Sequence, residues 1–564
     1  MILREIIFYW LGFGQCFMND EKKEDPIVST PLGKYRGSIL TSTLGKTIYS
    51  FRGIRYAKPP VKNLRFLPPV PVTKHTGIYN ATEDGDVCPQ LTCSLIPISE
   101  DCLFANVYTT KLPNENEILK RPVVIYIHSG ALYALSGRSD DVGPQYFMDQ
   151  DILLVTFNYR LGVLGFISTG DKEAPGNNGF KDQVTLMRWV KKNIEYFGGD
   201  PNSVTLFGYS AGGMSVTLHL ISPMSKGLFH QAIIGSFSAL GQWPTGRNQL
   251  DVTKRQARVV GCPDDTPANI IRCLRQRSFE ELQYSLSKMF EFESSPSLLW
   301  KPVIEEDFGQ ERFLTDHPMK LVLEGKFHEV PILSGVTAEE FSYKAIEMVK
   351  NPRMLKYLDE NWEKIAPIIF LYERDTQQSK MISRGLRSFY FGGKKLDSTI
   401  LHPLAQLVQA TTGFAVNRVV KLFSEKTNRS VYYYRFSYMG RYSYVYLPES
   451  NGSLLYGPVH QDDLIYIFPC SFLFPKFEKT DPEFRIIQKL TTMWANFART
   501  GELIPEVCDR LDYAEWKPFN STTQKYMDIG DRLKMGENLY AENYAVWEQL
   551  FPLSQYNSSL NICY

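Results

Sequence analysis

VTLFGYSAG, at residues 204–212, is the stretch of the sequence that decides the fold class. Its first four residues are apolar or β-branched, as in a buried strand, and a helical pattern follows at residues 216–220. A serine in the tight turn between a strand and a helix needs glycine on both sides, because the backbone is strained and neighbouring elements crowd it. Gly208 and Gly212 meet this requirement around Ser210. A bare G-x-S-x-G arises by chance in roughly one chain in five of this length, so the motif needs support from the rest of the chain.

The segments before this turn predict a mostly parallel sheet. Continuous apolar and β-branched runs at residues 123–127 and 152–157 are typical of strands buried on both faces of such a sheet. Apolar side chains then recur at helical spacing from Gln183 to Phe197, ahead of the strand at 204–207. The order strand, helix, strand predicts an α/β fold.

The strand expected at residues 123–127 runs into a loop of small residues, His128 to Ala131. Small residues in such a loop allow backbone N–H groups to point at a negative charge that develops on a substrate oxygen. In folds with a serine turn of this kind, the loop at this place contributes to the oxyanion hole. Taken alone, the loop would be interpreted as a plain β-turn.

Five further stretches are informative when taken with the serine turn. They are FRGIRYA at 51–57, SEDCL at 99–103, NYRLG at 158–162, DQ at 182–183 and FGGDP at 197–201. With them the chain resembles the type-B carboxylesterases of the carboxylesterase/cholinesterase family, insect members most of all. The resemblance implies one α/β-hydrolase domain over residues 28–552, with a large central sheet covered by helices on both faces, and a C-terminal tail at 553–564.

The resemblance also implies a catalytic triad. Ser210 matches the family nucleophile, Glu340 in GVTAEE matches the acid, and His460 in YGPVHQDD matches the base. The order serine, acid, histidine is the one that α/β-hydrolase topology demands. A neutral His460 would take the Ser210 proton as Oγ attacks an ester carbonyl, while Glu340 holds the imidazole tautomer. Glu339 is the rival acid, although adjacent side chains at an extended strand end point to opposite sides.

Backbone N–H groups of Gly130, Ala131 and Ala211 are the expected oxyanion donors. Ser129 and Ala131 stand where the family usually has glycine, so the loop is expected to differ in shape while its backbone donors remain. Tyr209 stands where many members carry glutamate, which is expected to remove a negative charge from the floor of the active-site gorge. The mechanism needs no metal or organic cofactor, and the sequence suggests no ligand cluster.

Other positions are interpreted through the same resemblance. Ser238 matches a serine that supports the acid from behind, and Glu100 and Arg160 match a buried ion pair. His219 is expected to pack against the sheet rather than take part in chemistry. Trp243 either lines the gorge or belongs to the core.

The composition is that of a globular protein, with 43% hydrophobic and 22% charged residues among 564. The chain has 62 Lys and Arg residues and 61 Asp and Glu residues, so there is no net electrostatic field that would favour binding to nucleic acid or to an anionic membrane. Beyond the N-terminus no apolar run approaches the roughly 18 residues of a membrane span. Residues 1–17, with Arg4 and an apolar stretch from Ile6, predict a signal peptide and hence secretion, an ordinary strand or helix being the alternative.

Cysteines and glycosylation acceptors also bear on whether the protein is secreted. Two cysteine pairs would each close a short loop, Cys88 with Cys102 and Cys262 with Cys273. We expect disulfides there if the compartment is oxidising, and buried free thiols if it is not. Acceptors of the N-x-S/T kind, which matter on a secreted surface, occur at Asn80, Asn428, Asn451, Asn520 and Asn557.

Three functions remain open at this point. The sequence favours a serine hydrolase that cleaves small neutral carboxylic esters through an acyl-enzyme, with the ester as its small-molecule partner. A non-catalytic adhesion or binding protein of the same fold is the alternative; such relatives typically lose a triad member, and this chain keeps all three. A cholinesterase ranks third, because no tryptophan lies between Cys88 and Cys102 to bind a quaternary ammonium by cation–π attraction.

Overall fold

The computed structural model describes residues 25–91, 96–114, 117–445 and 457–556. The signal peptide expected at residues 1–17, the acceptors Asn451 and Asn557, and most of the C-terminal tail lie outside these ranges.

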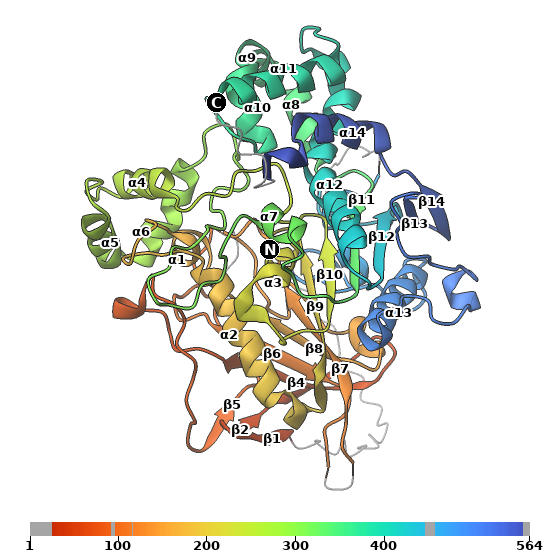
Figure 1. Cartoon of the computed structure of the whole chain (residues 1–564). Helices are drawn as coiled ribbons and strands as arrows, with labels where there is room; N and C mark the ends of the chain where they lie inside the picture. Colours follow the sequence, from red (N-terminus) through yellow and green to blue (C-terminus); the bar gives the residue numbers. More distant parts are fainter. Residues whose placement is uncertain (1–24, 92–95, 115–116, 446–456, 557–564) are drawn as a thin grey trace, which may run out of the picture.

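Within the described residues, eleven strands form one central sheet in the order β14-β13-β12-β11-β10-β9-β7-β8-β6-β4-β3 (Figure 1). The run from β8 to β13 is parallel, and β14, β6, β4 and β3 pair antiparallel with their neighbours. A smaller sheet holds β1, β2 and β5. The strands are β1 Ile27–Thr30, β2 Gly33–Arg36, β3 Ser38–Thr41, β4 Thr47–Arg55, β5 Ile78–Asn80, β6 Phe104–Thr109, β7 Arg121–Ile127, β8 Leu153–Phe157, β9 Gly199–Tyr209, β10 Gln231–Gly235, β11 Ile332–Thr337, β12 Val431–Phe436, β13 Lys525–Ile529 and β14 Leu533–Glu537.

Helices cover both faces of this sheet, as the sequence predicts for an α/β fold. Their bounds are α1 Gly162–Phe166, α2 Asn178–Asn193, α3 Ala211–Ile221, α4 Leu250–Val259, α5 Pro267–Gln276, α6 Phe279–Tyr284, α7 Pro318–Leu323, α8 Ser342–Lys350, α9 Pro352–Glu360, α10 Trp362–Phe370, α11 Gln377–Phe391, α12 Leu401–Lys426, α13 Phe484–Thr500 and α14 Ala541–Leu550.

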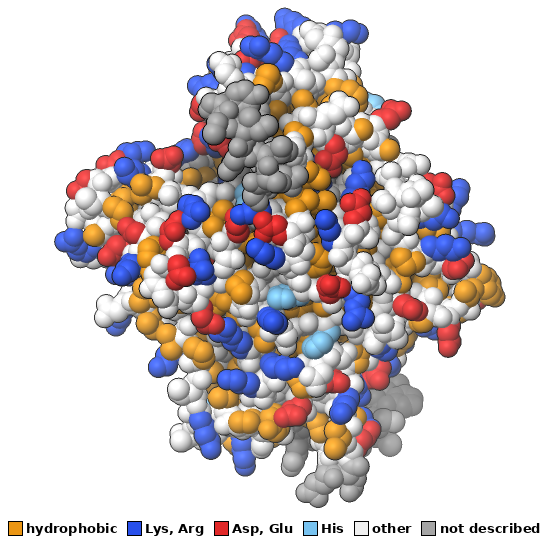
Figure 2. All heavy atoms as spheres, viewed as in Figure 1, with side chains coloured by type: hydrophobic (Ala, Val, Ile, Leu, Met, Phe, Trp, Pro, Cys, Tyr) orange, Lys and Arg blue, Asp and Glu red, His pale blue; other side chains and the backbone are white. Residues whose placement is uncertain are grey.

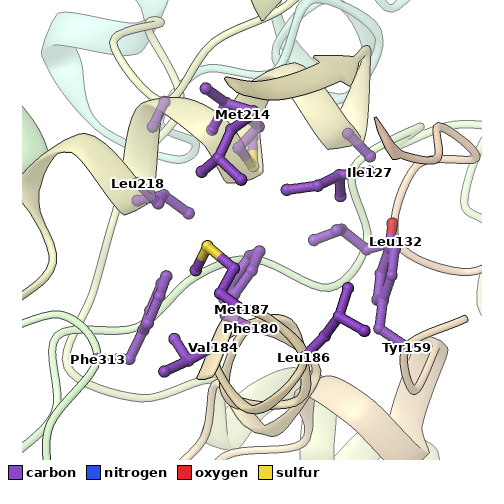
Figure 3. Close-up of a cluster of buried hydrophobic side chains, with 14 of the residues drawn as sticks. Ile127, Leu132, Tyr159, Phe180, Val184, Leu186, Met187, Met214, Leu218 and Phe313 are labelled. Carbon is purple, nitrogen blue, oxygen red and sulfur yellow. The ribbon is translucent and has the colours of Figure 1, made fainter. Parts of the chain in front are cut away.

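The alternation of side chains along β7 shows how the two layers form. Val123, Ile125 and Ile127 join a core cluster with residues of α2, α3 and α12, part of which Figure 3 shows. Val124 and Tyr126 point to the other face and join a second cluster with residues of α13. Both faces of β7 are therefore buried over residues 123–127, which explains why this part of the strand is apolar without interruption.

The strands predicted at 123–127 and 204–207 lie within β7 and β9, and the strand predicted at 152–157 matches β8 except that β8 begins one residue later. The predicted helix, however, begins late. The apolar periodicity starts at Gln183, whereas α2 begins at Asn178 and ends at Asn193, with a 3₁₀ turn to Phe197. The first turns of α2 bury polar groups: Lys181 pairs with Glu305 at 2.6 Å, and Asp182 pairs with Arg160. Because these buried residues are charged, hydrophobic periodicity could not reveal the start of the helix.

Helices α8 to α11 and α14 gather around one end of α12, above the sheet in Figure 1, and share a third apolar cluster. The surface in Figure 2 shows Lys, Arg, Asp and Glu side chains mixed over one face, in keeping with the near-zero net charge. Among the described residues, no helix combines the length and the apolar character needed to span a membrane.

Candidate active site

Ser210 lies in the turn between β9 and α3, in a strained conformation. Its φ is 55° and its ψ is −118°, and its N–H donates to the carbonyl of Gly235 at 2.8 Å. A Cβ on Gly208 would lie 2.1 Å from the carbonyl oxygen of Gly212, and a Cβ on Gly212 would lie 2.0 Å from that of Ile127. Both glycines are therefore required by close backbone contacts, as expected from the sequence.

The loop after β7 turns back on itself next to Ser210. N–H groups of Tyr133 and Ala134 donate to the carbonyl of Gly130, each at 2.9 Å. A Cβ on Gly130 would lie 1.9 Å from the carbonyl oxygen of Ala134, and Ala131 has a φ of 52°, which is unusual for a residue other than glycine. In the described part of the chain, the N–H groups of Gly130, Ala131 and Ala211 have no acceptor. Three donors are thus available at one place.

His460 and Glu340 form a buried hydrogen-bonded pair. The imidazole Nδ1 lies 2.6 Å from Glu340 Oε2, and Glu340 Oε1 accepts from the Thr337 N–H at 2.9 Å. The imidazole Nε2 is buried and has no hydrogen-bond partner among the described residues. Because Nδ1 donates to the carboxylate, Nε2 carries the lone pair that a general base needs.

Glu339 has a different environment from its neighbour. Its N–H donates to the carbonyl of Pro458 at 3.0 Å, and its backbone bridges to Val459. Burial raises the pKa of its carboxyl to about 7. The short contact to the imidazole comes from Glu340, so the geometry favours Glu340 over Glu339 as the residue that orients His460.

These segments meet in a cavity of about 330 Å³, called the Ser210 cavity below. Ser210, His460 and the three expected oxyanion donors line it. Much of the remaining wall is apolar or aromatic: Phe237, Leu298, Phe341, Ile369, Phe370, Leu371 and Val408. The Phe341 ring stacks on the His460 ring with centroids 3.9 Å apart, so it fixes the plane of the imidazole from one side.

Tyr209 does not line the Ser210 cavity, so the expectation that it forms the floor is wrong. Its side chain is fully buried beneath His460, with ring centroids 5.3 Å apart. The Tyr209 hydroxyl accepts from Ser236 Oγ at 2.6 Å and from the Gln461 N–H at 3.1 Å. The strand end turns residue 209 away from Ser210, because successive side chains point to opposite faces.

Two acids lie in the same buried layer as Tyr209. Asp463 accepts from the Tyr434 hydroxyl at 3.1 Å, and burial raises the pKa of its carboxyl to about 7, with the charge of Glu340 acting in the same direction. Asp462 accepts from the N–H groups of Tyr444 and Val459 at 2.9 Å each, and burial raises its pKa to about 7 as well.

Ser238 does not support Glu340, which corrects the expectation from the resemblance. Its Oγ donates to the carbonyl of Ala415 in α12 at 2.7 Å and accepts from the Leu240 N–H at 3.1 Å. The hydroxyl therefore holds the segment after β10 against α12. The second oxygen of Glu340 is satisfied by backbone instead.

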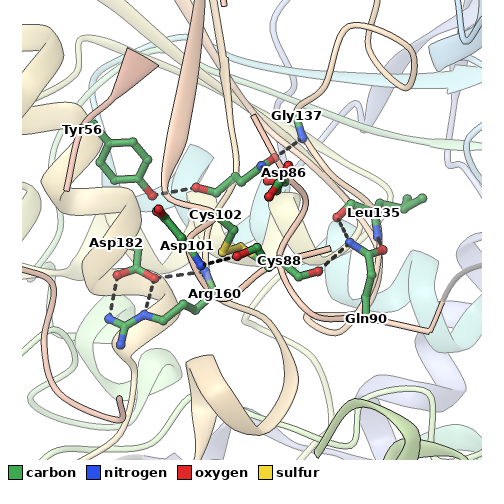
Figure 4. The surroundings of a disulfide bond; sticks show 12 residues. Tyr56, Asp86, Cys88, Gln90, Asp101, Cys102, Leu135, Gly137, Arg160 and Asp182 are labelled. Atoms are coloured by element: carbon green, nitrogen blue, oxygen red, sulfur yellow. Dashed lines mark hydrogen bonds and ion pairs between the residues drawn. A yellow bond between two sulfur atoms is a disulfide. The ribbon is translucent and has the colours of Figure 1, made fainter. Parts of the chain in front are cut away.

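Glu100 and Arg160 do not pair with each other, which is a second correction. Arg160 Nε and Nη2 donate to the two oxygens of Asp182 at 2.8 and 2.7 Å (Figure 4). Glu100 pairs with Arg65, whose Nε donates to Oε1 at 2.7 Å. Both residues are buried in ion pairs, as expected, but the partners come from helix α2 and from the segment after β4.

His219 and Trp243 both belong to the interior. The two His219 nitrogens lie 2.8 Å from Ser225 Oγ and from Gln183 Oε1, and burial lowers its pKa to about 3. Trp243 stacks behind Phe237 with centroids 4.4 Å apart and does not line the Ser210 cavity. His219 is therefore structural, and Trp243 supports a cavity wall from the core.

Both expected disulfides are present, Cys88–Cys102 and Cys262–Cys273. The first lies near the oxyanion loop: Gln90 donates to the carbonyls of Cys88 and Leu135 and accepts from the Leu135 N–H at 2.6 Å (Figure 4). The second joins the end of α4 to α5. The described glycosylation acceptors Asn80, Asn428 and Asn520 are all exposed.

Sequence reasoning missed Gln461, which closes one side of the Ser210 cavity. Its φ of 79° is unusual for a residue with a side chain, and its Oε1 accepts from Ser129 Oγ at 3.0 Å. Beyond this hydrogen bond lies a second cavity of about 270 Å³, lined among others by His128, Asp141 and Cys470. Leu135 and Gln461 line both cavities. The sequence signal that could have identified Gln461 as a cavity residue was its position directly after His460.

Comparison with known proteins agrees with this geometry. The model of the Carboxylesterase family matches residues 24–547. The chain belongs to the carboxylesterase family. It is a carboxylic ester hydrolase with the α/β-hydrolase fold, as the resemblance implied.

Two relatives from insects are similar over most of their length. Esterase FE4 of Myzus persicae is 36% identical over 508 residues, which cover 88% of this chain and 87% of that protein. Juvenile hormone esterase of Tribolium castaneum is 35% identical over 545 residues, which cover 93% and 91%. The expectation that this carboxylesterase is similar to insect members is confirmed.

A solved structure has the same fold. It is the juvenile hormone esterase of Manduca sexta with OTFP covalently attached, which superposes with a TM-score of 0.82 at 26% identity and covers 94% of this chain and 100% of that one.

Proposed function

We propose that this carboxylesterase cleaves esters through an acyl-enzyme on Ser210, with His460 as the base and Glu340 as the residue that orients it. The observation that carries the proposal is the buried His460–Glu340 hydrogen bond beside a cavity that also contains Ser210. The free Nε2 of His460 takes the Ser210 proton while Oγ attacks the carbonyl carbon. The same nitrogen returns that proton to the alcohol oxygen as the ester bond breaks, and then activates water to release the acid.

The negative charge on the carbonyl oxygen is held by backbone groups in this proposal. The donors are the N–H groups of Gly130, Ala131 and Ala211, for which the described part of the chain offers no acceptor. Because donors of this kind are fixed before the reaction, they stabilise the transition state without reorganisation, and each contributes about 3 kcal/mol. A Cβ at residue 131 leaves its N–H in place, so the altered loop is compatible with activity.

We further propose that neutral esters are better substrates than choline esters. Among the described residues that line the Ser210 cavity there is no Asp or Glu, whereas Lys344 lines it. A quaternary ammonium would lose hydration without meeting an opposite charge. The sequence attributed the missing negative charge to Tyr209 in place of glutamate. Because Tyr209 is buried and does not line the cavity, the residues that do line it carry the argument instead.

Secretion is part of the same proposal. The two disulfides are typical of an oxidising compartment, and three of the glycosylation acceptors are exposed. Peptide mapping of the native protein without reduction, combined with N-terminal sequencing, tests it. Free thiols at these four cysteines would contradict secretion.

Active-site labelling tests the serine mechanism. The purified protein is incubated with a fluorophosphonate and digested, and the labelled peptide is identified by mass spectrometry. We expect the label on Ser210 and none on a Ser210→Ala variant. A label on another serine, with hydrolysis inhibited in parallel, would contradict the proposed nucleophile.

A further inference from the structure

Lys344 places a positive charge in an otherwise uncharged part of the Ser210 cavity. It lies in the first turn of α8, four residues after Glu340, and lines the same cavity as Ser210. Its Nζ is 5.1 Å from the centre of the Phe341 ring, and that ring stacks on His460. Phe341 therefore lies next to both the Lys344 ammonium and the His460 imidazole.

No carboxylate neutralises this lysine at short range. Among the described residues, no Asp or Glu oxygen lies within 4.0 Å of Lys344 Nζ, and Nζ donates no hydrogen bond to the protein. Burial lowers its pKa, against the opposing influence of Glu347. Lys181 shows the contrast, because its buried ammonium lies 2.6 Å from Glu305. The Phe341 ring face gives the Lys344 ammonium modest support and does not remove its charge.

An ammonium in such a wall attracts an anion more strongly than an ammonium in water does. Water screening is weaker beside aromatic and aliphatic walls, and part of the desolvation of Lys344 has already occurred on folding. Ser294, Ser297 and Thr412 line the same cavity, and serine and threonine hydroxyl groups can donate to an anion.

We propose that Lys344 binds a carboxylate that the substrate carries away from its scissile ester, on the acyl or the alcohol side, so that esters with a second, free carboxylate are preferred substrates. This inference rests on the proposed esterase function of Ser210 and deepens it by naming a substrate class. The carboxylate takes no part in bond breaking. It contributes binding energy through an ion pair with Lys344, and it positions the ester carbonyl over Ser210.

A charge series of matched esters tests the proposal. On the acyl side the probes are the 4-nitrophenyl esters of hexanoate and 6-aminohexanoate and the mono-4-nitrophenyl ester of adipate. On the alcohol side, hexyl acetate is compared with the acetate ester of 6-hydroxyhexanoate. The quantity measured is the ratio of kcat/KM for the anionic ester to that for its neutral partner, in wild type and in Lys344→Met, Lys344→Arg and Lys350→Met.

We expect Lys344→Met to lower this ratio about tenfold in at least one of the two series, which is equivalent to about 1.4 kcal/mol. Lys344→Arg should restore most of the ratio. Lys350→Met removes an exposed lysine from the same helix and should leave the ratio unchanged, which controls for the overall field. The wild-type ratio should also fall as salt is added.

The outcomes separate this inference from the proposed function. If hexanoate is cleaved in a Ser210-dependent way and the ratio in Lys344→Met equals that of wild type in both series, the role of Lys344 is overturned while the esterase function stands. If Lys350→Met lowers the ratio as much as Lys344→Met does, a long-range field explains the preference and the specific site is overturned. If no ester is cleaved, the proposed function fails and this inference fails with it.

Discussion

The two cavities on either side of Gln461 differ in what points into them. The Ser210 cavity contains a serine, a histidine whose Nε2 has no hydrogen-bond partner among the described residues, and backbone N–H groups that find no acceptor there. The second cavity also has a nucleophilic atom type and a histidine, Cys470 and His128. Yet burial raises the pKa of the Cys470 thiol to about 12 and lowers that of His128 to about 4. Similar residue types therefore give the proposed reactive site in one cavity, whereas in the other the thiol is protonated and the imidazole is neutral.

Orientation by hydrogen bonds explains the contrast. Glu340 holds the His460 ring by a carboxylate, whereas Nδ1 of His128 lies 2.8 Å from the carbonyl of Ser129, and its ring stacks on Tyr159. A carboxylate stabilises the imidazolium that forms during catalysis, and a carbonyl does so much less. The hydrogen bond between Ser129 Oγ and Gln461 Oε1 joins two residues of the second cavity, and Gln461 lines the Ser210 cavity as well.

The largest expected effect comes from removing the nucleophile of the Ser210 cavity. Removing the thiol of the second cavity is the matched control. Ser210→Ala should lower kcat/KM for 4-nitrophenyl hexanoate by roughly 10³-fold or more while leaving the protein folded. Cys470→Ala should change it by less than about threefold, because a thiol with a raised pKa is protonated at neutral pH. Hydrolysis assays and circular dichroism measure both. Equal losses in the two variants would show that the second cavity takes part in catalysis.

The two disulfides should contribute equally to stability, but only Cys88–Cys102 should affect activity. Replacing both cysteines of either pair by serine should cost about 3 kcal/mol of unfolding free energy, because each closes a loop of similar length. Loss of Cys88–Cys102 should in addition raise KM, since Gln90 in that loop holds Leu135, which lines both cavities. Urea unfolding and steady-state kinetics test this. An equal KM for both variants would argue against the connection through Gln90.

Stability should fall as the pH rises because of the buried acids. The pKa of Asp463 is about 7 in the folded protein, above its usual value of 3.8, so the folded state binds the proton more tightly. This contribution is complete below about pH 4 and is lost as the pH rises toward 7. The Asp463→Asn variant lacks this contribution, so the stability advantage of wild type over the variant should shrink by about 3 kcal/mol between pH 5 and 8.

Asp141, on the wall of the second cavity, provides the matched control for this measurement. Burial raises its pKa to about 6, a smaller shift, so the corresponding change for Asp141→Asn should be smaller. Urea midpoints at the two pH values give both quantities. A larger change for Asp141 than for Asp463 would contradict the ranking of the two buried sites.

The smallest effect is expected from opening the boundary between the cavities. Ser129→Gly with Gln461→Gly removes both side chains of the hydrogen bond and relieves the φ of 79° at residue 461. The ratio of kcat/KM for a 1-naphthyl ester to that for the ethyl ester should rise about tenfold, or about 1.4 kcal/mol, as the bulky alcohol gains space. Gln461→Asn, which keeps an amide at the boundary, is the control. An unchanged ratio in the double glycine variant would mean that the second cavity is not accessible from Ser210.

Much of the fold and of the candidate site could be predicted from the hydrophobic pattern and from motifs in the sequence. The buried parts of strands β7, β8 and β9 were predictable because both of their faces are buried, so residues 123–127, 153–157 and 204–207 are apolar or β-branched. The turn at Ser210 was predictable because it needs glycine on both sides. A Cβ on either glycine would lie about 2 Å from a backbone oxygen, so no other residue fits there. The start of α2 was not predictable, because its first turns bury charges that are neutralised by Arg160 and by Glu305.

The sequence by itself determined the α/β order, the serine turn and, through its resemblance, the residues expected to act in catalysis. Tertiary structure decided which side chains meet: Asp182 rather than Glu100 pairs with Arg160, and Ser238 faces α12 rather than Glu340. It also placed Tyr209 behind the cavity, and Lys344 and Gln461 in its wall. The physical reason is that local patterns report burial and backbone conformation, whereas a polar contact depends on the packing of segments that are distant in sequence.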